Sequence, residues 1–205
     1  GYDHVVNAAD LFMSPRYGLR TQCSVHEIAF FEYSNVMASE GMKNLLKNFR
    51  CGLSDLEMVR EYGYTGYPLS CHIGIKSSGN LQTGLSGPVG APIKKGDPCS
   101  TNIGYWGSNI CRAGWVAAGE NDLPAPAKDY VEQFAAPYFY ACTQWYENLK
   151  AGVKGGTLRE IIDTCLPFEE FAVFLNPGHL IHYDEWVSSP IYKGSDDEIR
   201  SGMYM

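Results

Sequence analysis

The 205-residue sequence contains no run of about 20 uninterrupted apolar residues, the length that a helix needs to cross a bilayer. Its first ten residues, GYDHVVNAAD, lack the basic and apolar regions of a signal peptide. Lysine and arginine do not cluster, and 16 of them stand against 23 acidic residues, which gives a formal net charge of −7. We therefore expect a cytoplasmic protein that binds neither nucleic acid nor a membrane.

No Cys-x-x-Cys pair occurs among the seven cysteines, which are Cys23, Cys51, Cys71, Cys99, Cys111, Cys142 and Cys165. An odd and widely spread set fits neither a disulfide framework nor a zinc cluster. We expect all seven to be buried thiols. Because 45% of the residues are hydrophobic, the chain can bury one sizeable core without disulfide bonds or a structural metal.

The first half of the chain is predicted to contain two helices and three strands, over residues 24–50, 54–63, 71–76, 98–104 and 109–117. Apolar residues at helical spacing predict the first helix, and an S-x-x-E capping box from Ser54 to Glu57 begins the second. Gly63 ends the second helix. A Gly-rich loop over 77–92 separates the first two strands.

The second half repeats this order. A long helix over 127–150 precedes a short helix that begins at Thr157 with the same capping box to Glu160, and a strand over 172–177 follows. Two such helix-helix-strand units related by a pseudo-twofold axis predict an α+β domain with a central cleft, where ligands usually bind.

Two asparagines lie in the predicted hairpin around Tyr105 and Trp106. A symmetric register pairs Asn102 with Asn109, which would place both amides on one face of the sheet, close enough to touch one ligand. Asparagine is depleted in strands, so an opposed pair favours a site. The alternative is that both residues serve the backbone of the turn.

The segment 176–190, NPGHLIHYDEWVSSP, concentrates polar and aromatic side chains between glycine and proline, and this density is typical of a pocket lining. Its candidate catalytic and binding residues are His179, His182, Asp184, Glu185 and Trp186. One helical turn would let His179 and His182 face the same ligand, whereas a strand would send them to opposite sides.

Several segments, in order, resemble one known family: SVHEIAFFEYSNVMASEGM, CGLSDLEM, KKGDPCSTNIGYWGSNICRAGW, AGVKGGTLREI and NPGHLIHYDEW. It is the pita-bread fold family of methionine aminopeptidase, proline-specific aminopeptidase, proline dipeptidase and creatinase. The resemblance implies a lead-in over 1–22 and a pita-bread domain over 23–205. It further implies that the family's C-terminal strands would follow Met205 and are absent from this sequence.

In the metallopeptidases of this family, two hairpin aspartates, a histidine after a glycine and two later glutamates hold a pair of divalent cations. Here the hairpin positions match Asn102 and Asn109, and the histidine matches His179. The family's substrate-contacting loop histidine has no counterpart in the loop after the first strand. Neutral amides cannot neutralise two adjacent cations, so we expect no metal cofactor. The alternative is a Mn, Co or Zn pair.

The resemblance therefore implies a metal-free C–N hydrolase, or a binding domain for a small amide or dipeptide-like ligand. His179 would act as acid or base, with His182 beside it and Asp184 or Glu185 as its carboxylate partner, and Trp186 would form an apolar wall. Asn102 and Asn109 would contact the ligand. The alternatives are an active metal-dependent Xaa-Pro peptidase and a non-catalytic pseudoenzyme. By family habit we expect a homodimer.

Overall fold

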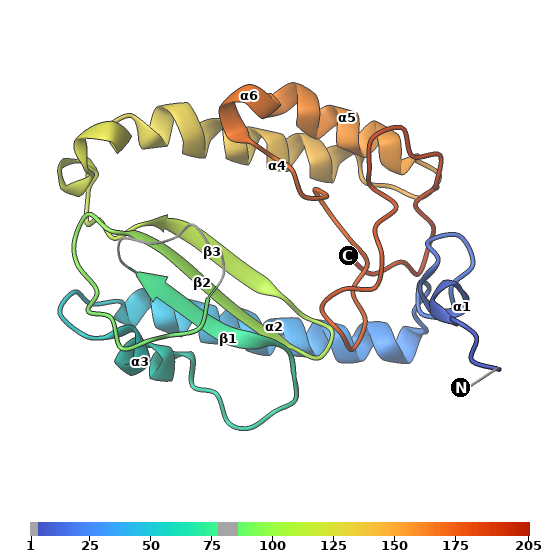
Figure 1. The fold of residues 1–205 in the computed structure, drawn as a ribbon, viewed down its shortest axis with the longest axis horizontal. Coiled ribbons are helices and arrows are strands. Elements are labelled where there is room, and N and C mark those ends of the chain that lie inside the picture. The colour runs from blue at the N-terminus through green and yellow to red at the C-terminus, as the bar shows by residue number, and fades with distance from the viewer. Residues whose placement is uncertain (1–3, 78–85) are drawn as a thin grey trace. The chain divides into compact units, whose positions relative to one another are not determined.

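The computed structural model describes residues 4–77 and 86–205, and it divides the chain into two compact units. Unit 1 comprises Gly1–Ile28, Asp129–His182 and Trp186–Met205, and unit 2 comprises Ala29–Lys128 and Tyr183–Glu185. Figure 1 shows the elements of both. Half of the predicted loop over 77–92, residues 78–85, lies outside the described residues. None of the helices in the described part is long and apolar enough to span a membrane.

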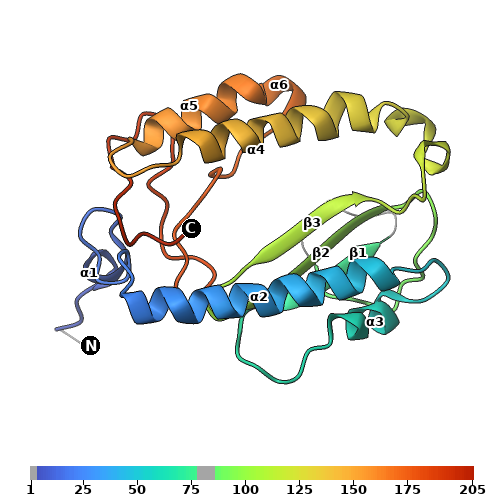
Figure 2. The ribbon, with the colours of Figure 1, turned by 180° about the vertical axis from the view of Figure 1, so that it is seen from behind.

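Unit 2 is built on a long helix and a three-stranded sheet. Helix α2 (Val25–Asn48), whose first turn belongs to unit 1, lies along one face of the sheet formed by β1 (Leu69–Ser77), β2 (Pro98–Tyr105) and β3 (Ile110–Trp115), as Figure 2 shows from behind. The predicted helix and all three predicted strands are confirmed. Apolar side chains from both layers make the core, including Ala38, Met42, Leu45, Ile75 and Ile103.

The short helix of unit 2 begins as predicted. Ser54 and Glu57 form a complete capping box at the start of α3 (Asp55–Met58), which continues into the 3₁₀ turn η1 (Val59–Tyr62). Gly63 ends it with a φ of 66°. Two further 3₁₀ turns, η2 (Glu120–Asp122) and η3 (Ala125–Ala127), lead out of the sheet.

The hairpin register differs from the predicted one. Strand β2 pairs with β3 from Pro98 opposite Trp115 to Ile103 opposite Ile110, so Asn102 lies opposite Cys111, not opposite Asn109. The predicted Asn102–Asn109 opposition is therefore wrong. The turn requires a positive φ at its third position, and Gly107 supplies it with a φ of 76°, which moves the centre of the hairpin one residue later.

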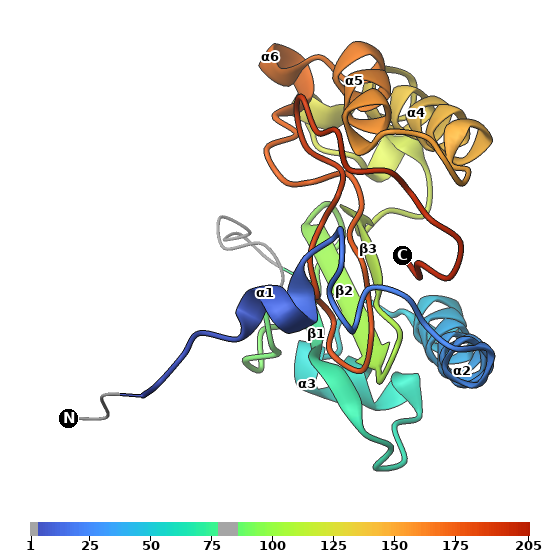
Figure 3. The same cartoon turned by 90° about the vertical axis from the view of Figure 1, so that its right-hand side faces the viewer.

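Unit 1 is helical. It contains α1 (Ala9–Met13), the π-helical turn η4 (Val131–Ala135), and three helices, α4 (Ala136–Asn148), α5 (Gly155–Cys165) and α6 (Phe168–Phe171). Helices α4 and α5 lie side by side (Figure 3), and Ala141, Leu158 and Ile162 are buried in the core of this unit. The helix predicted over 127–150 is present as η4 followed directly by α4, over 131–148. Pro137 lacks an amide hydrogen, which explains the irregular π-turn just before α4.

Two predictions for unit 1 are wrong. Helix α5 begins at Gly155, and its N-cap makes no side-chain hydrogen bond, so Thr157 and Glu160 do not form a capping box. Residues 172–177 are not a strand. Ala172 has a φ of 49°, which interrupts an extended backbone. The Arg159 guanidinium donates hydrogen bonds to the carbonyl oxygens of Val173 and Leu175, both at 3.0 Å, where a neighbouring strand would otherwise donate.

Candidate functional site

Asn102 lies in the middle of the sheet, where it is 1% exposed. Its Nδ2 donates to the backbone oxygen of His72 at 2.6 Å, and the same atom lies 3.9 Å from Cys71 Sγ. Its Oδ1 has no hydrogen-bond partner among the described residues. Asn102 is therefore held within the sheet by β1, and its amide nitrogen is already used by the protein.

Asn109 lies just before β3 and contacts Glu185, which also belongs to unit 2. Its Nδ2 donates to Glu185 Oε1 at 2.8 Å, and its Oδ1 accepts from Cys111 Sγ at 3.3 Å. The structure thus brings together two predicted site residues that are far apart in sequence, Asn109 and Glu185. We call Cys71, Asn102, Asn109, Cys111 and Glu185 the polar cluster of unit 2.

The two thiols of the polar cluster are protonated at neutral pH. Burial, followed by the hydrogen bond and charge of Glu185, raises the pKa of Cys71 to about 12. Burial, followed by the charge of Glu185, also raises the pKa of Cys111. A thiol rather than a thiolate at each position makes these cysteines hydrogen-bond donors, not nucleophiles.

His179 and Trp186 lie together in unit 1. Their ring centroids are 4.3 Å apart, with the planes at 37° to each other, and Trp186 is about half exposed. His179 Nδ1 lies 3.2 Å from the oxygen of Leu180. Because a carbonyl only accepts hydrogen bonds, this contact favours a proton on Nδ1 and leaves Nε2 with a lone pair.

His182 has a different set of partners from His179. It is 7% exposed, and its Nε2 lies 3.1 Å from Glu27 Oε1 in the first turn of α2. The loop that carries it is closed by backbone hydrogen bonds that join Leu180 to Val187 and Ser188, at 3.0 and 2.7 Å. His182 thereby anchors this loop to α2 within unit 1. Asp184 is exposed in the same loop and belongs to unit 2.

The residues present do not fit a pair of divalent cations. Asn102 and Asn109 are neutral, and Glu185 is the one carboxylate that the described contacts bring to them. Within residues 4–77 and 86–205, no three His, Cys, Asp or Glu side chains are arranged to hold a metal ion. Two cations about 4 Å apart need more negative charge than this set supplies.

Sequence reasoning missed three contributors, Cys71, Cys111 and Glu27. Ser24 and Glu27 form the same S-x-x-E box as Ser54 and Glu57, with Glu27 Oε2 2.7 Å from the Ser24 amide, so that spacing was a usable signal. No local signal marks the two thiols. The expectation that every cysteine is buried is wrong, because Cys51 is exposed, Cys99 is buried and the other five are half-buried.

No family model matches the chain, and no curated protein matches it. Several solved structures, in contrast, are similar to it. The chain is similar to a dipeptidase from Mycobacterium ulcerans, with 16% identity and a TM-score of 0.74 over 97% of this chain and 53% of that one. It is also similar to an X-Pro aminopeptidase from Thermotoga maritima, with 14% identity and a TM-score of 0.72 over 91% and 56%.

A third similar structure is an Xaa-Pro dipeptidase from Bacillus anthracis, with 19% identity and a TM-score of 0.70 over 90% of this chain and 53% of that one. The chain therefore spans about half the length of the solved structures it matches. At these identities the likeness establishes the fold alone. This protein has the α+β pita-bread fold of the prolidases and Xaa-Pro peptidases.

Proposed function

We propose that this chain binds a small amide or dipeptide-like ligand through Glu185, without a dinuclear metal centre. The observation that carries the proposal is the way Glu185 is held. It accepts from Asn109 Nδ2 at 2.8 Å and interacts with the Cys71 thiol, and it forms no ion pair with any described residue. A carboxylate oriented by neutral donors keeps its charge available for a cationic group of the ligand, such as the α-ammonium of a dipeptide.

Calorimetric titration of the chain with a proline dipeptide tests this role. Glu185→Gln keeps the shape and an acceptor oxygen for Asn109 but removes the charge, so we expect it to lower affinity at least about tenfold. The matched control is Glu32→Gln, an exposed glutamate of the same unit. Equal affinity in wild type and Glu185→Gln contradicts the proposal.

A second candidate function is hydrolysis of a C–N bond, which the orientation of His179 favours. Its Nε2 lone pair can accept a proton from water, and a positioned imidazole contributes typically 10²–10⁴-fold. We expect His179→Ala to remove turnover of a small amide while leaving binding at Glu185 intact. His26→Ala, an exposed histidine on α2, is the control.

The remaining alternative, an active metal-dependent Xaa-Pro peptidase, makes an opposite prediction. Elemental analysis after dialysis against Mn²⁺ or Co²⁺ would then find about two metals per chain, together with cleavage of the dipeptide. We expect no stoichiometric metal in the wild type. Asn102→Asp with Asn109→Asp adds carboxylates at the two hairpin positions, the second of them beside Glu185, and we expect this variant to gain Mn²⁺ binding.

A further inference from the structure

The backbone on both sides of His179 is held by hydrogen bonds within unit 1. On the C-terminal side, the Leu180 amide donates to the Ser188 carbonyl at 2.7 Å, and the Val187 amide donates to the Leu180 carbonyl at 3.0 Å. The side chains of Leu180 and Val187 are both buried. The Leu180 carbonyl oxygen, which also lies beside the His179 ring, therefore has a well-defined position.

The hydroxyl of Ser189 holds the main chain on the N-terminal side. Its Oγ lies 2.6 Å from the Gly178 carbonyl oxygen, the shorter of its two contacts with carbonyls, and it accepts from the Ile191 amide at 3.0 Å. Gly178 packs closely, because a Cβ there would lie 2.8 Å from the Trp145 ring and 3.0 Å from Ile191 Cδ1. Ser189 thus connects the residue before His179 to the far end of the same loop.

The His179 imidazole itself has two contacts. Its Nδ1 lies 3.2 Å from the Leu180 oxygen, and its ring lies against Trp186, with the centroids 4.3 Å apart. Rotation of the imidazole by 180° would place a carbon-bound hydrogen against the carbonyl and lose the hydrogen bond, and the indole restricts tilting of the ring. Nε2 forms no hydrogen bond with a described residue. These contacts favour one orientation, with the proton on Nδ1.

We propose that Ser189 and Trp186 are positioning residues that hold His179 in the Nδ1–H tautomer, so that Nε2 accepts a proton from a water molecule that attacks a small amide. The inference rests on the hydrolytic role proposed above for His179. The water oxygen bonds to the amide carbon as its proton passes to Nε2, and this proton then moves to the leaving nitrogen as the C–N bond breaks. A base held in one orientation does not have to be oriented during the reaction.

The tautomer is measured in the full 205-residue chain with ¹⁵N-labelled histidine, by long-range ¹H–¹⁵N correlation spectra at pH 8.5, where free histidine is neutral. The His179 signals are those missing from the spectrum of His179→Ala. We expect the Nδ1–H tautomer alone in the wild type, and a mixture of both tautomers in Ser189→Ala and in Trp186→Leu. Trp186→Phe, which keeps an aromatic face, should retain the single tautomer. Trp186 is about half exposed, so its variants are expected to fold.

Ser188→Ala is the matched control. Ser188 is the neighbour of Ser189 in the loop, but its hydroxyl has no hydrogen-bond partner among the described residues, so its removal should leave the tautomer unchanged. In steady-state kinetics with a small amide, we expect Ser189→Ala to lower kcat at least about tenfold and to leave KM unchanged, because a misplaced base slows the chemical step without weakening binding.

Both tautomers in the wild type, or a single tautomer retained in Ser189→Ala or in Trp186→Leu, overturn the proposal. An equal change in Ser188→Ala overturns it too, because the effect would then not come from the Ser189 hydroxyl. A single tautomer that is present in the wild type and lost in both variants supports the positioning. If the wild type then turns over no amide, only the hydrolytic role of His179 fails.

Discussion

Gly74 lies directly opposite Asn102 in the pairing of β1 with β2, and Asn102 Oδ1 fills the space that a Cβ at position 74 would occupy. The Asn102 side chain can occupy this space only because the residue across from it has no side chain. We therefore expect Gly74→Ala to lower the free energy of unfolding by about 1–3 kcal/mol.

Urea denaturation measures this cost. Gly87→Ala is the matched control, because a Cβ at position 87 meets no described atom within 4 Å. Combining Gly74→Ala with Asn102→Ala should recover part of the loss, since the second change removes the overlapping atom. Strictly additive losses would contradict the overlap.

Glu27 predicts a pH dependence of stability. Hydrogen bonds from the Ser24 amide and hydroxyl, followed by the nearby His182, lower the pKa of Glu27. A carboxyl whose pKa is lower in the folded state stabilises the fold above its unfolded pKa, and this contribution is lost as the pH falls through the folded pKa. Glu27→Gln should therefore reduce stability at pH 7 and flatten the loss of stability below about pH 4.3.

Thermal unfolding between pH 7 and pH 3 measures both effects, with Glu32→Gln as the control on the same helix. Parallel profiles of stability against pH for wild type and Glu27→Gln would show that Glu27 does not contribute to the pH dependence of stability.

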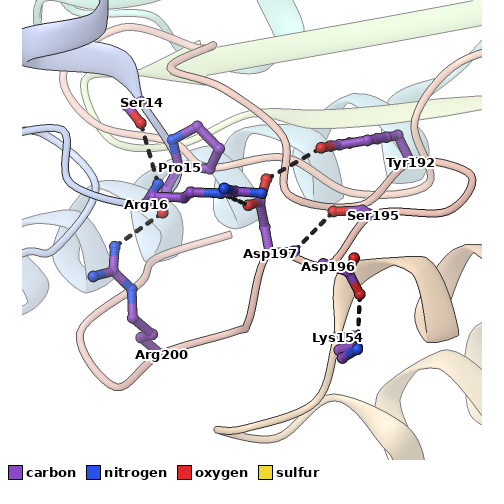
Figure 4. Close-up of polar contacts among 9 residues, drawn as sticks. All are labelled: Ser14, Pro15, Arg16, Lys154, Tyr192, Ser195, Asp196, Asp197 and Arg200. Carbon is purple, nitrogen blue, oxygen red and sulfur yellow. Dashed lines mark hydrogen bonds and ion pairs between the residues drawn. The ribbon is translucent and has the colours of Figure 1, made fainter.

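Asp197 ties the N-terminal segment to the end of the chain in unit 1. Its carboxylate accepts from Arg16 and from the Tyr192 hydroxyl, the latter at 3.4 Å, and it is 5% exposed (Figure 4). Arg200 adds a hydrogen bond of 2.9 Å to the Pro15 carbonyl. We expect Asp197→Asn to lower the free energy of unfolding, because the buried Asp197 carboxylate loses the charge that its hydrogen bond with the exposed Arg16 side chain uses.

Hydrogen exchange localises this effect. Amides near Arg16 should exchange faster in Asp197→Asn, while the control Asp196→Asn, whose contact with Lys154 is exposed, should leave them unchanged. Equal exchange rates of these amides in the two variants would show that Asp197 does not anchor the segment around Arg16.

The cysteines should differ sharply in reactivity. Cys51 is exposed, whereas burial raises the pKa of Cys99 to about 12, as burial and Glu185 do for Cys71. At pH 7 we expect N-ethylmaleimide to label Cys51 first, with mass spectrometry of peptides as the readout. Labelling of Cys71 should rise about tenfold for each pH unit, because the thiolate is the reactive form. Unfolded protein, in which all seven react, is the control.

The sequence by itself determined the elements whose signals are local. Helical apolar spacing identified α2, the Ser54 to Glu57 spacing identified the start of α3, and short segments between Gly- and Pro-containing turns identified β1, β2 and β3. These features depend on residues a few positions apart, so they can be predicted without knowledge of the tertiary structure.

Tertiary structure decided the rest. Packing helps to decide which glycine of the hairpin has the positive φ, because a Cβ at Gly107 would overlap the Phe31 ring of α2. The position of this glycine sets the strand register, in which Asn102 does not lie opposite Asn109. Residues 172–177 have strand-like composition, but Arg159 donates hydrogen bonds to the carbonyls of Val173 and Leu175. The contact of Asn109 with Glu185 joins residues 76 positions apart, and only the folded chain places that carboxylate beside its amide and thiol partners.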